Sequence, residues 1–279
     1  MSDVTETFTQ AEVMSRMSRD IRAMGRDLSK NQARLLVDRY YQVQHDRIRA
    51  AAQVRAAEEA TEPTELLAFF LAQTETLENQ IKVSLDVYSA HHPMGRWARG
   101  HKGVGPVIAA GLLSHIAIER CTTVGDLWAF AGLAPGKTWE KGQKIPWNSR
   151  LKTLCAFKLG ESFVKVSNQP DAFYGRFYAE WKQRYRDKNE AGGFAETAAR
   201  TLTQRKFGDD TTALARYKLG KLPDARIHAM ARRQAVKLFL SHLHETWRQH
   251  EGLPAPPPYA FAMLGHGHYI PPPPPVKEV

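Results

Sequence analysis

A lysine and a glycine turn stand directly before an apolar segment at residues 102–116, KGVGPVIAAGLLSHI. Glycine accepts a positive φ and has no Cβ to hold a ligand away, and proline suits the first turn of a helix. The amides at such a helix N-terminus bind phosphate oxygens by hydrogen bonding and through the helix dipole. The pattern predicts an anion site formed by Lys102, Gly103, Val104, Gly105 and Pro106. A purely structural turn has the same pattern, because short glycine turns before helices are common.

Further basic residues lie on both sides of this turn. Arg96 and Arg99 precede it, and a basic loop follows at residues 137–152. The cations of the loop are Lys137, Lys141, Lys144, Arg150 and Lys152. Cations that neutralise phosphates release counterions, so binding is expected to weaken steeply with salt and to depend little on base sequence. Trp139 and Trp147 in the loop are expected either to stack on unpaired bases or to pin the loop to the protein.

The basic residues of the chain are concentrated in its second half. The formal net charge is +10, and residues 91–190 carry 16 Lys and Arg against 8 Asp and Glu, whereas residues 61–90 carry 1 against 5. A basic segment after an acidic one is typical of a module that binds a polyanion. A solvated basic surface explains the same numbers. The cluster of Arg232, Arg233 and Lys237 has the same two interpretations.

Apolar side chains recur at steps of three and four over residues 13–48, the spacing of one face of a helix. The stripe consists of Val13, Met17, Ile21, Met24 and Leu28, and then of Leu35, Leu36, Tyr40, Val43 and Ile48. Ser29 or Asn31 is the expected cap between its two parts, and another helix is expected from Pro63 to about Ala90. So narrow a stripe favours a helical hairpin or coiled coil. We therefore expect residues 10–90 to pair with each other, with a second copy as a homodimer, or with a helical partner.

The whole chain is expected to be all-α, in three parts. Residues 1–92 form the helical or coiled-coil region, residues 93–252 a helix-hairpin-helix domain, and residues 253–279 a Pro-rich tail. A helix-hairpin-helix grips the backbone of a duplex without reading its bases. Whether residues 185–224 form an ordered insertion stays open, and residues 207–225 have no assignable chemistry.

No cofactor and no metal site are predicted. Cys121 and Cys155 are too few for a disulfide framework or a cysteine-based zinc site, which suits a reducing, cytoplasmic location. His242 and His244 are two residues apart and cannot share a helix face, so a zinc site with His228 needs ligands from elsewhere. His266 and His268 belong to the Pro-rich tail. No apolar run reaches the length of a membrane span.

Four motifs in order resemble the C-terminal domain of a family of insertion-sequence transposases. They are GVGPVIAAGLLSHI, GDLWAFAGLAPG, the loop GKTWEKGQK, and NSRLKTLCAFKLGESF, within residues 103–163. This family pairs a RuvC-like catalytic domain with a serine-bearing transposase domain and is guided by a bridge RNA. Pro170, Tyr174 and Tyr178 resemble its proline and tyrosine stretch, and HAMARRQAVKLFLSHLHETW its closing helix. The resemblance covers roughly residues 95–250.

Two departures from the family pattern concern catalysis. The family carries its nucleophilic serine in the loop, typically just before a glycine, where this chain has Trp139, Glu140, Lys141 and Gly142. None of these side chains can form a phosphoserine. Residues 1–90 also lack the alternating pattern of the strands that hold metal-binding carboxylates in a RuvC-like domain. Ion pairing at i and i+4 accounts for Asp20, Asp27 and Asp38.

The expected function is therefore non-catalytic binding of nucleic acid by a transposase-derived protein, with no catalytic residue assigned. Duplex or branched DNA is the favoured ligand, and structured RNA is an alternative because the resembled family is RNA-guided. One rival is an active or partner-dependent transposase or recombinase that uses Thr138 or Ser149 as its nucleophile. A second rival is an assembly or scaffold protein whose hairpin packs on protein.

Overall fold

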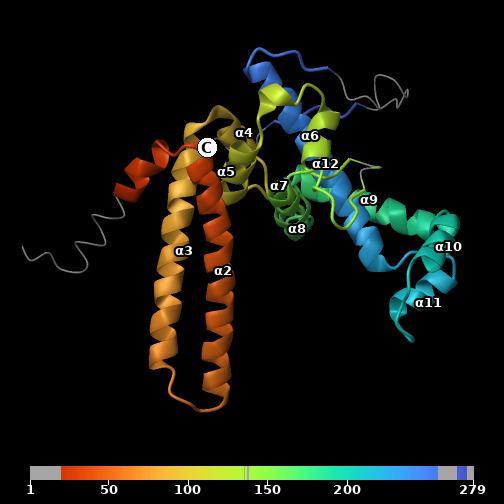
Figure 1. The fold of residues 1–279 in the computed structure, drawn as a ribbon, viewed down its shortest axis with the longest axis horizontal. Helices are drawn as coiled ribbons and strands as arrows, with labels where there is room; N and C mark the ends of the chain where they lie inside the picture. Colours follow the sequence, from red (N-terminus) through yellow and green to blue (C-terminus); the bar gives the residue numbers. More distant parts are fainter. Residues whose placement is uncertain (1–19, 135, 137, 257–268, 275–279) are drawn as a thin grey trace, which may run out of the picture. The chain divides into compact units, whose positions relative to one another are not determined.

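The computed structural model describes residues 20–134, 136, 138–256 and 269–274, and this part of the chain consists of helices and connecting segments without a strand (Figure 1). The predicted all-α class is confirmed. Lys137, His266, His268, Val13 and Met17 lie outside the described residues. None of the described helices is both long enough and apolar enough to cross a membrane.

The chain folds as two compact units. The first contains the residues up to Arg99 and the segment Gly105–Ala117, and the second contains Gly100–Val104 and the residues from Ile118 onward. The chain therefore passes between the units within the glycine turn itself. Residues 93–99 and 105–117 belong to the same compact unit as the N-terminal helices. The sequence instead predicted a domain boundary between residues 92 and 93.

The first unit is built on a helical hairpin of α2 (Lys30–Glu59) and α3 (Glu65–His91), which lie side by side and antiparallel (Figure 1). Ser29 and Gln32 form a capping box that begins α2, as the sequence suggested for Ser29. Between the helices, Arg47 pairs with Glu78, which also accepts from Gln44 at 3.2 Å. Burial alone raises the pKa of the Glu78 carboxyl, but these hydrogen bonds outweigh burial and lower it.

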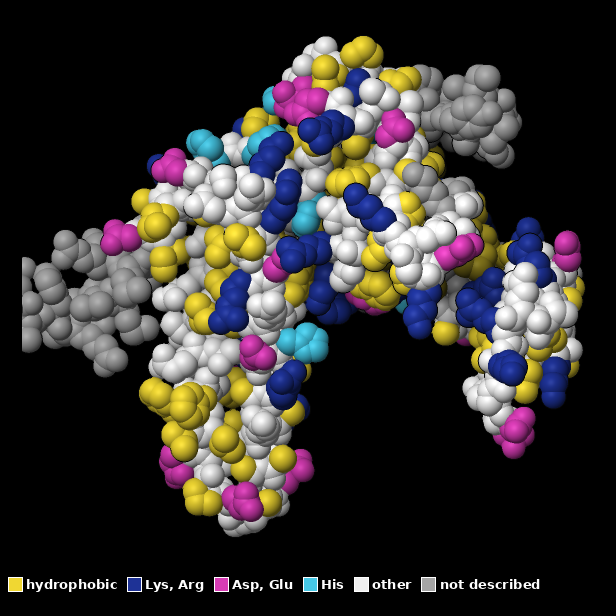
Figure 2. Space-filling view, viewed as in Figure 1, with side chains coloured by type: hydrophobic (Ala, Val, Ile, Leu, Met, Phe, Trp, Pro, Cys, Tyr) yellow, Lys and Arg dark blue, Asp and Glu magenta, His cyan; other side chains and the backbone are white. Residues whose placement is uncertain are grey.

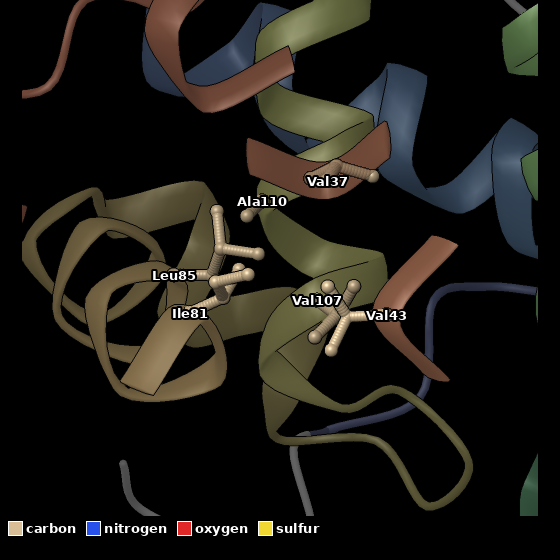
Figure 3. Close-up of a cluster of buried hydrophobic side chains, with 6 residues drawn as sticks. All are labelled: Val37, Val43, Ile81, Leu85, Val107 and Ala110. Atoms are coloured by element: carbon tan, nitrogen blue, oxygen red, sulfur yellow. The ribbon is translucent and has the colours of Figure 1, made fainter. Parts of the chain in front are cut away.

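The short helices α4 (Pro93–Arg99) and α5 (Pro106–His115) complete the first unit. Val107 and Ala110 of α5 pack into the core with Val37, Val43, Ile81 and Leu85 of the hairpin (Figure 3). Leu35 and Ile48 of the predicted stripe are instead 64% and 53% exposed. Val43 of the stripe is buried, but the other buried positions of α2 are smaller residues outside it, because the stripe was drawn through the largest apolar side chains. They are Ala33, Val37, Val54 and Ala57.

The second unit is organised around the long helix α12 (Asp224–His250), which packs on several shorter elements. These are η1 (Ile118–Arg120), α6 (Val124–Phe130), a π-helical segment η2 (Leu154–Leu159), α8 (Gly160–Lys165) and α9 (Phe173–Glu190). With α7 (Ser149–Thr153), η2 and α8 form one continuous helical stretch. Its fully buried side chains include Phe163, which stacks on Tyr174 of α9 and contacts Phe239 of α12.

Residues 185–224 are ordered and carry α10 (Ala195–Gln204) and α11 (Thr212–Lys218). Ala198, Tyr217, Leu222 and Ile227 form their core. The buried Asn189 exchanges two hydrogen bonds with the backbone of Leu222, donating to its carbonyl at 3.0 Å and accepting from its amide at 2.8 Å. This pair joins the two ends of the α10–α11 segment.

We expect Leu85→Ala to destabilise the first unit by about 2–5 kcal/mol, because Leu85 is fully buried and its truncation leaves a cavity. Leu35→Ala on the same hairpin is the matched control, and it should change stability by less than about 0.5 kcal/mol. Urea unfolding followed by helicity at 222 nm measures both variants. Equal midpoints for the two variants would contradict the assigned core.

Acid should destabilise the second unit through His101. This side chain is 3% exposed beside Tyr174, and burial, followed by the nearby His242, lowers its pKa from 6.5 to about 4. The His101 imidazole therefore binds a proton below about pH 6.5 in the unfolded chain, but only below about pH 4 in the folded protein. The free energy of unfolding should fall by about 2 kcal/mol between pH 7 and pH 5 from this group alone. His101→Leu should reduce that loss in urea unfolding, and an unchanged loss would show that His101 is not responsible.

Candidate nucleic-acid interface

The two glycines of the turn have different roles. Gly103 has a φ of +92°, and a Cβ on it would lie 2.9 Å from the Phe163 ring, so both the backbone conformation and the packing require glycine. Gly105 is the extended N-cap residue of α5, and the position of its missing Cβ faces open space. Only Gly105 therefore has room beside it for a ligand.

The N-terminus of α5 has no side-chain cap. Pro106 occupies the first helical position, as the sequence predicted, and the first intrahelical bond runs from the amide of Ala109 to the carbonyl of Gly105. The amides of Val107 and Ile108 are among those that no bond within a helix can satisfy. In contrast, the amide of Val104 donates to the carbonyl of His101 at 3.1 Å, and the Val104 side chain is buried. The uncapped amides thus lie at the Gly105 end of the turn.

The three cations before the turn all have partners within their own units. Arg96 donates to the carbonyls of Ala90 and His91, at 2.9 and 3.2 Å, and so caps the end of α3. Arg99 forms an ion pair with Asp86 at 2.6 Å. Lys102, in the second unit, pairs with Asp171 at 3.2 Å. These contacts give all three residues structural roles.

The basic loop has a defined turn at its tip. The amide of Gln143 donates to the carbonyl of Glu140 at 3.1 Å, and Gly142 between them has a φ of +94°, as a type II turn requires. The indole of Trp139 donates to the carbonyl of Gln143 at 2.6 Å, while its side chain stays 44% exposed. The turn therefore holds Lys141 at an exposed tip, and Lys144 follows it, also exposed.

The second end of the loop is fixed to the fold by Trp147 and Asn148. The Lys152 ammonium lies 3.9 Å from the Trp147 ring, and both side chains lie against Gly132. Asn148 donates its amide to the carbonyl of Phe130 and caps α7 with its side chain. Trp147 thus attaches the loop to the protein, which agrees with the second of the two roles expected from the sequence. Exposed Arg150 and half-buried Lys152 lie on the helix that starts here.

The predicted site residues are divided between the two units. Gly105 and Pro106 belong to the first unit together with Arg96 and Arg99. Lys102, Gly103, Val104 and the described cations of the loop, Lys141, Lys144, Arg150 and Lys152, belong to the second. Of the rival nucleophiles, Thr138 is exposed in the loop and Ser149 is exposed at the first position of α7.

In the second unit, two cations of α12 lie against aromatic rings of other elements. The Lys237 ammonium lies 3.8 Å from the Trp128 ring, whose indole donates to the Lys237 carbonyl, and Arg232 lies 5.3 Å from Phe157 while pairing with Glu161. Burial, and then the charge of Arg233, lower the pKa of Lys237. Arg232 and Lys237 were found from the sequence, but their aromatic partners, which lie 75 and 109 residues earlier in the chain, were missed. The only signal was the abundance of aromatic residues in the two motifs that precede them.

Three histidines of α12 are hydrogen-bonded. His228 and His242 contact the hydroxyls of Tyr178 and Tyr174 at 2.7 and 2.9 Å, and His244 contacts the carbonyl of Cys121 at 2.9 Å. Burial lowers the pKa of all three imidazoles. Within the described part of the chain, no three His, Cys, Asp or Glu side chains gather in a way that could hold a metal ion.

Comparison with protein-family models, with curated proteins and with solved structures found no match to this chain.

The two glycines should respond differently to alanine. Gly103→Ala should cost about 1–3 kcal/mol, because it forces a positive φ on an L-residue and pushes a methyl group into Phe163. Gly105→Ala keeps an allowed conformation in open space and should cost less than about 1 kcal/mol. Thermal unfolding of the two variants compares these costs. A Gly105 variant as unstable as the Gly103 variant would contradict the open space at Gly105.

Proposed function

We propose that this protein binds the phosphate backbone of nucleic acid and does not cleave it. Duplex or branched DNA is the favoured ligand, and structured RNA is the alternative. The observation that carries the proposal is the uncapped N-terminus of α5, where Gly105 adjoins open space. Such an end offers amides and a positive dipole to one phosphate group.

The basic loop, which belongs to the second unit, is a separate source of positive charge in this proposal. Lys141 is held at the exposed tip of its turn, and Lys144 is also exposed, while the exposed Arg150 already takes part in an interaction of its own. Contacts of this kind attract a duplex without selecting a sequence. Arg96, Arg99 and Lys102 contribute less, because each already has an internal partner. The proposed binding residues are therefore a subset of those predicted from the sequence.

The absence of cleavage rests on the resemblance to the transposase family. The segment that would carry the family's serine is here a turn of Glu140, Lys141 and Gly142, closed by the Trp139 indole. Loss of the nucleophile with retention of the basic loop supports a role in holding nucleic acid. A transposase origin for the chain is part of the same proposal.

Gly105→Asp should weaken nucleic-acid binding by at least tenfold while leaving the fold intact. An aspartate at the N-cap accepts hydrogen bonds from the amides of α5 and repels phosphate. Fluorescence anisotropy with labelled duplex, forked and single-stranded DNA and with hairpin RNA, each over a salt series, measures the change. Thr64→Asp is the matched control, since α3 also begins at a residue without a side-chain cap. It should bind like the parent protein.

Three outcomes would overturn the proposal. Equal binding by the Gly105→Asp and Thr64→Asp variants would remove α5 from the interface. Binding that does not depend on salt, or no binding to any of the probes, would favour the scaffold function. Nicking of a supercoiled plasmid in Mg²⁺ that is lost on Thr138→Ala or Ser149→Ala would establish the enzymatic rival.

A further inference from the structure

The free end of the α2–α3 hairpin exposes an apolar patch on α3. Leu66, Phe69, Phe70 and Leu77 are 67%, 56%, 56% and 38% exposed. Figure 2 shows hydrophobic side chains gathered over this end of the hairpin. We call these four residues the tip patch. They are separate from the stripe that faces α2, which includes the buried Ile81 and Leu85.

The tip patch is the uncovered part of a longer stripe. Leu66, Phe70 and Leu77 follow steps of four and seven, and the same spacing continues to Ser84 and Tyr88. Both of those residues are covered by helices of the first unit. The carbonyl of Ser84 lies 2.9 Å from the ideal Cβ position of Gly25, and Tyr88 packs on the core that contains Val107 of α5. One end of the stripe thus already serves as a helix-packing surface.

The patch is large enough to matter energetically. Four side chains of this size and exposure present on the order of 400 Å² of apolar surface, a patch size that marks interaction sites on soluble proteins. A two-fold contact uses the same surface twice. With the surrounding rim, the buried area approaches the roughly 1,200 Å² at the lower end of stable interfaces.

The charges around the patch select the kind of partner. Residues 66–74 contain no charged side chain, and residues 61–80 contain Glu62, Glu65, Glu75 and the buried Glu78, which pairs with Arg47, but no lysine or arginine. An acidic rim repels nucleic acid and anionic membranes. In an antiparallel pairing of two α3 helices centred near residue 72, Glu62, just before one helix, is level with Lys82 of the other, and none of the four glutamates is level with another. Self-pairing therefore sets one cation against the acidic end of each partner helix.

We propose that the tip patch binds the tip patch of a second copy of this chain. The two hairpins then pack antiparallel about a two-fold axis and form a four-helix bundle. Three pairings of residues 10–90 were left open by the sequence, and the homodimer was one of them. This inference names the surface that would form it. It does not rest on nucleic-acid binding, so either proposal can fail without the other.

Sedimentation equilibrium of the full chain tests the proposal. The parent should sediment at twice the 31.5 kDa of the chain at micromolar concentration. A variant that combines Leu66→Asp and Phe70→Asp should raise the dimer dissociation constant at least 100-fold with unchanged helicity at 222 nm. Leu219→Asp is the matched control, because Leu219 is 70% exposed in the other unit. It should dimerise like the parent.

Cross-linking identifies the surface directly. A short bismaleimide should join two copies of a Gln73→Cys variant and should not join two copies of a Gln204→Cys variant, in which the exposed substituted residue lies on α10. Cys121 and Cys155 are buried and give little background. A monomeric parent, or a dimer that survives the aspartate substitutions, would overturn the proposal. Monomeric behaviour would mean that the chain covers the patch itself or keeps it for a different protein.

Discussion

The packing of α5 into the α2–α3 hairpin is the constraint on which the rest of the first unit depends. Every residue from Val107 to His115 is buried, and Val107 and Ala110 enter the same core as Ile81 and Leu85. A helix held in this way cannot shift without opening that core. The position of Gly105 at its N-terminus is therefore rigid, and a rigid donor group is the kind that binds an anion at little entropic cost.

This packing also explains which parts of the fold were predictable. Helical periodicity is a local signal, so the all-α class and the two long helices could be read from the sequence. The assignment of α5 to the hairpin depends on contacts with α2, about 70 residues earlier in the chain, and with α3, about 25 residues earlier, and no local pattern encodes these. The π-helical turns of Leu154–Leu159 could not be predicted either, because this segment contains no helix-breaking residue that would mark them.

The same distinction between local signals and tertiary contacts applies to the candidate site. The residue types at the turn and in the loop were evident, because glycine, proline and lysine act locally. The partners of Arg96, Arg99 and Lys102 were not, since each cation pairs with a group chosen by tertiary structure. A count of the basic residues near a glycine turn is thus larger than the number of cations available to a ligand, because some of them are already paired within the fold.

The hydrogen-bonded pair of Asn189 and Leu222 has a consequence for the evolution of this fold. It brings the end of α9 and the approach to α12 together, so the intervening residues leave and re-enter the second unit through a narrow neck. A chain that departs and returns at one place can be lengthened, shortened or exchanged without altering the register of α9 on α12. The α10–α11 segment is therefore the part of the second unit whose length we expect to change most easily, provided that its contacts with Tyr185 and Ile227 are kept.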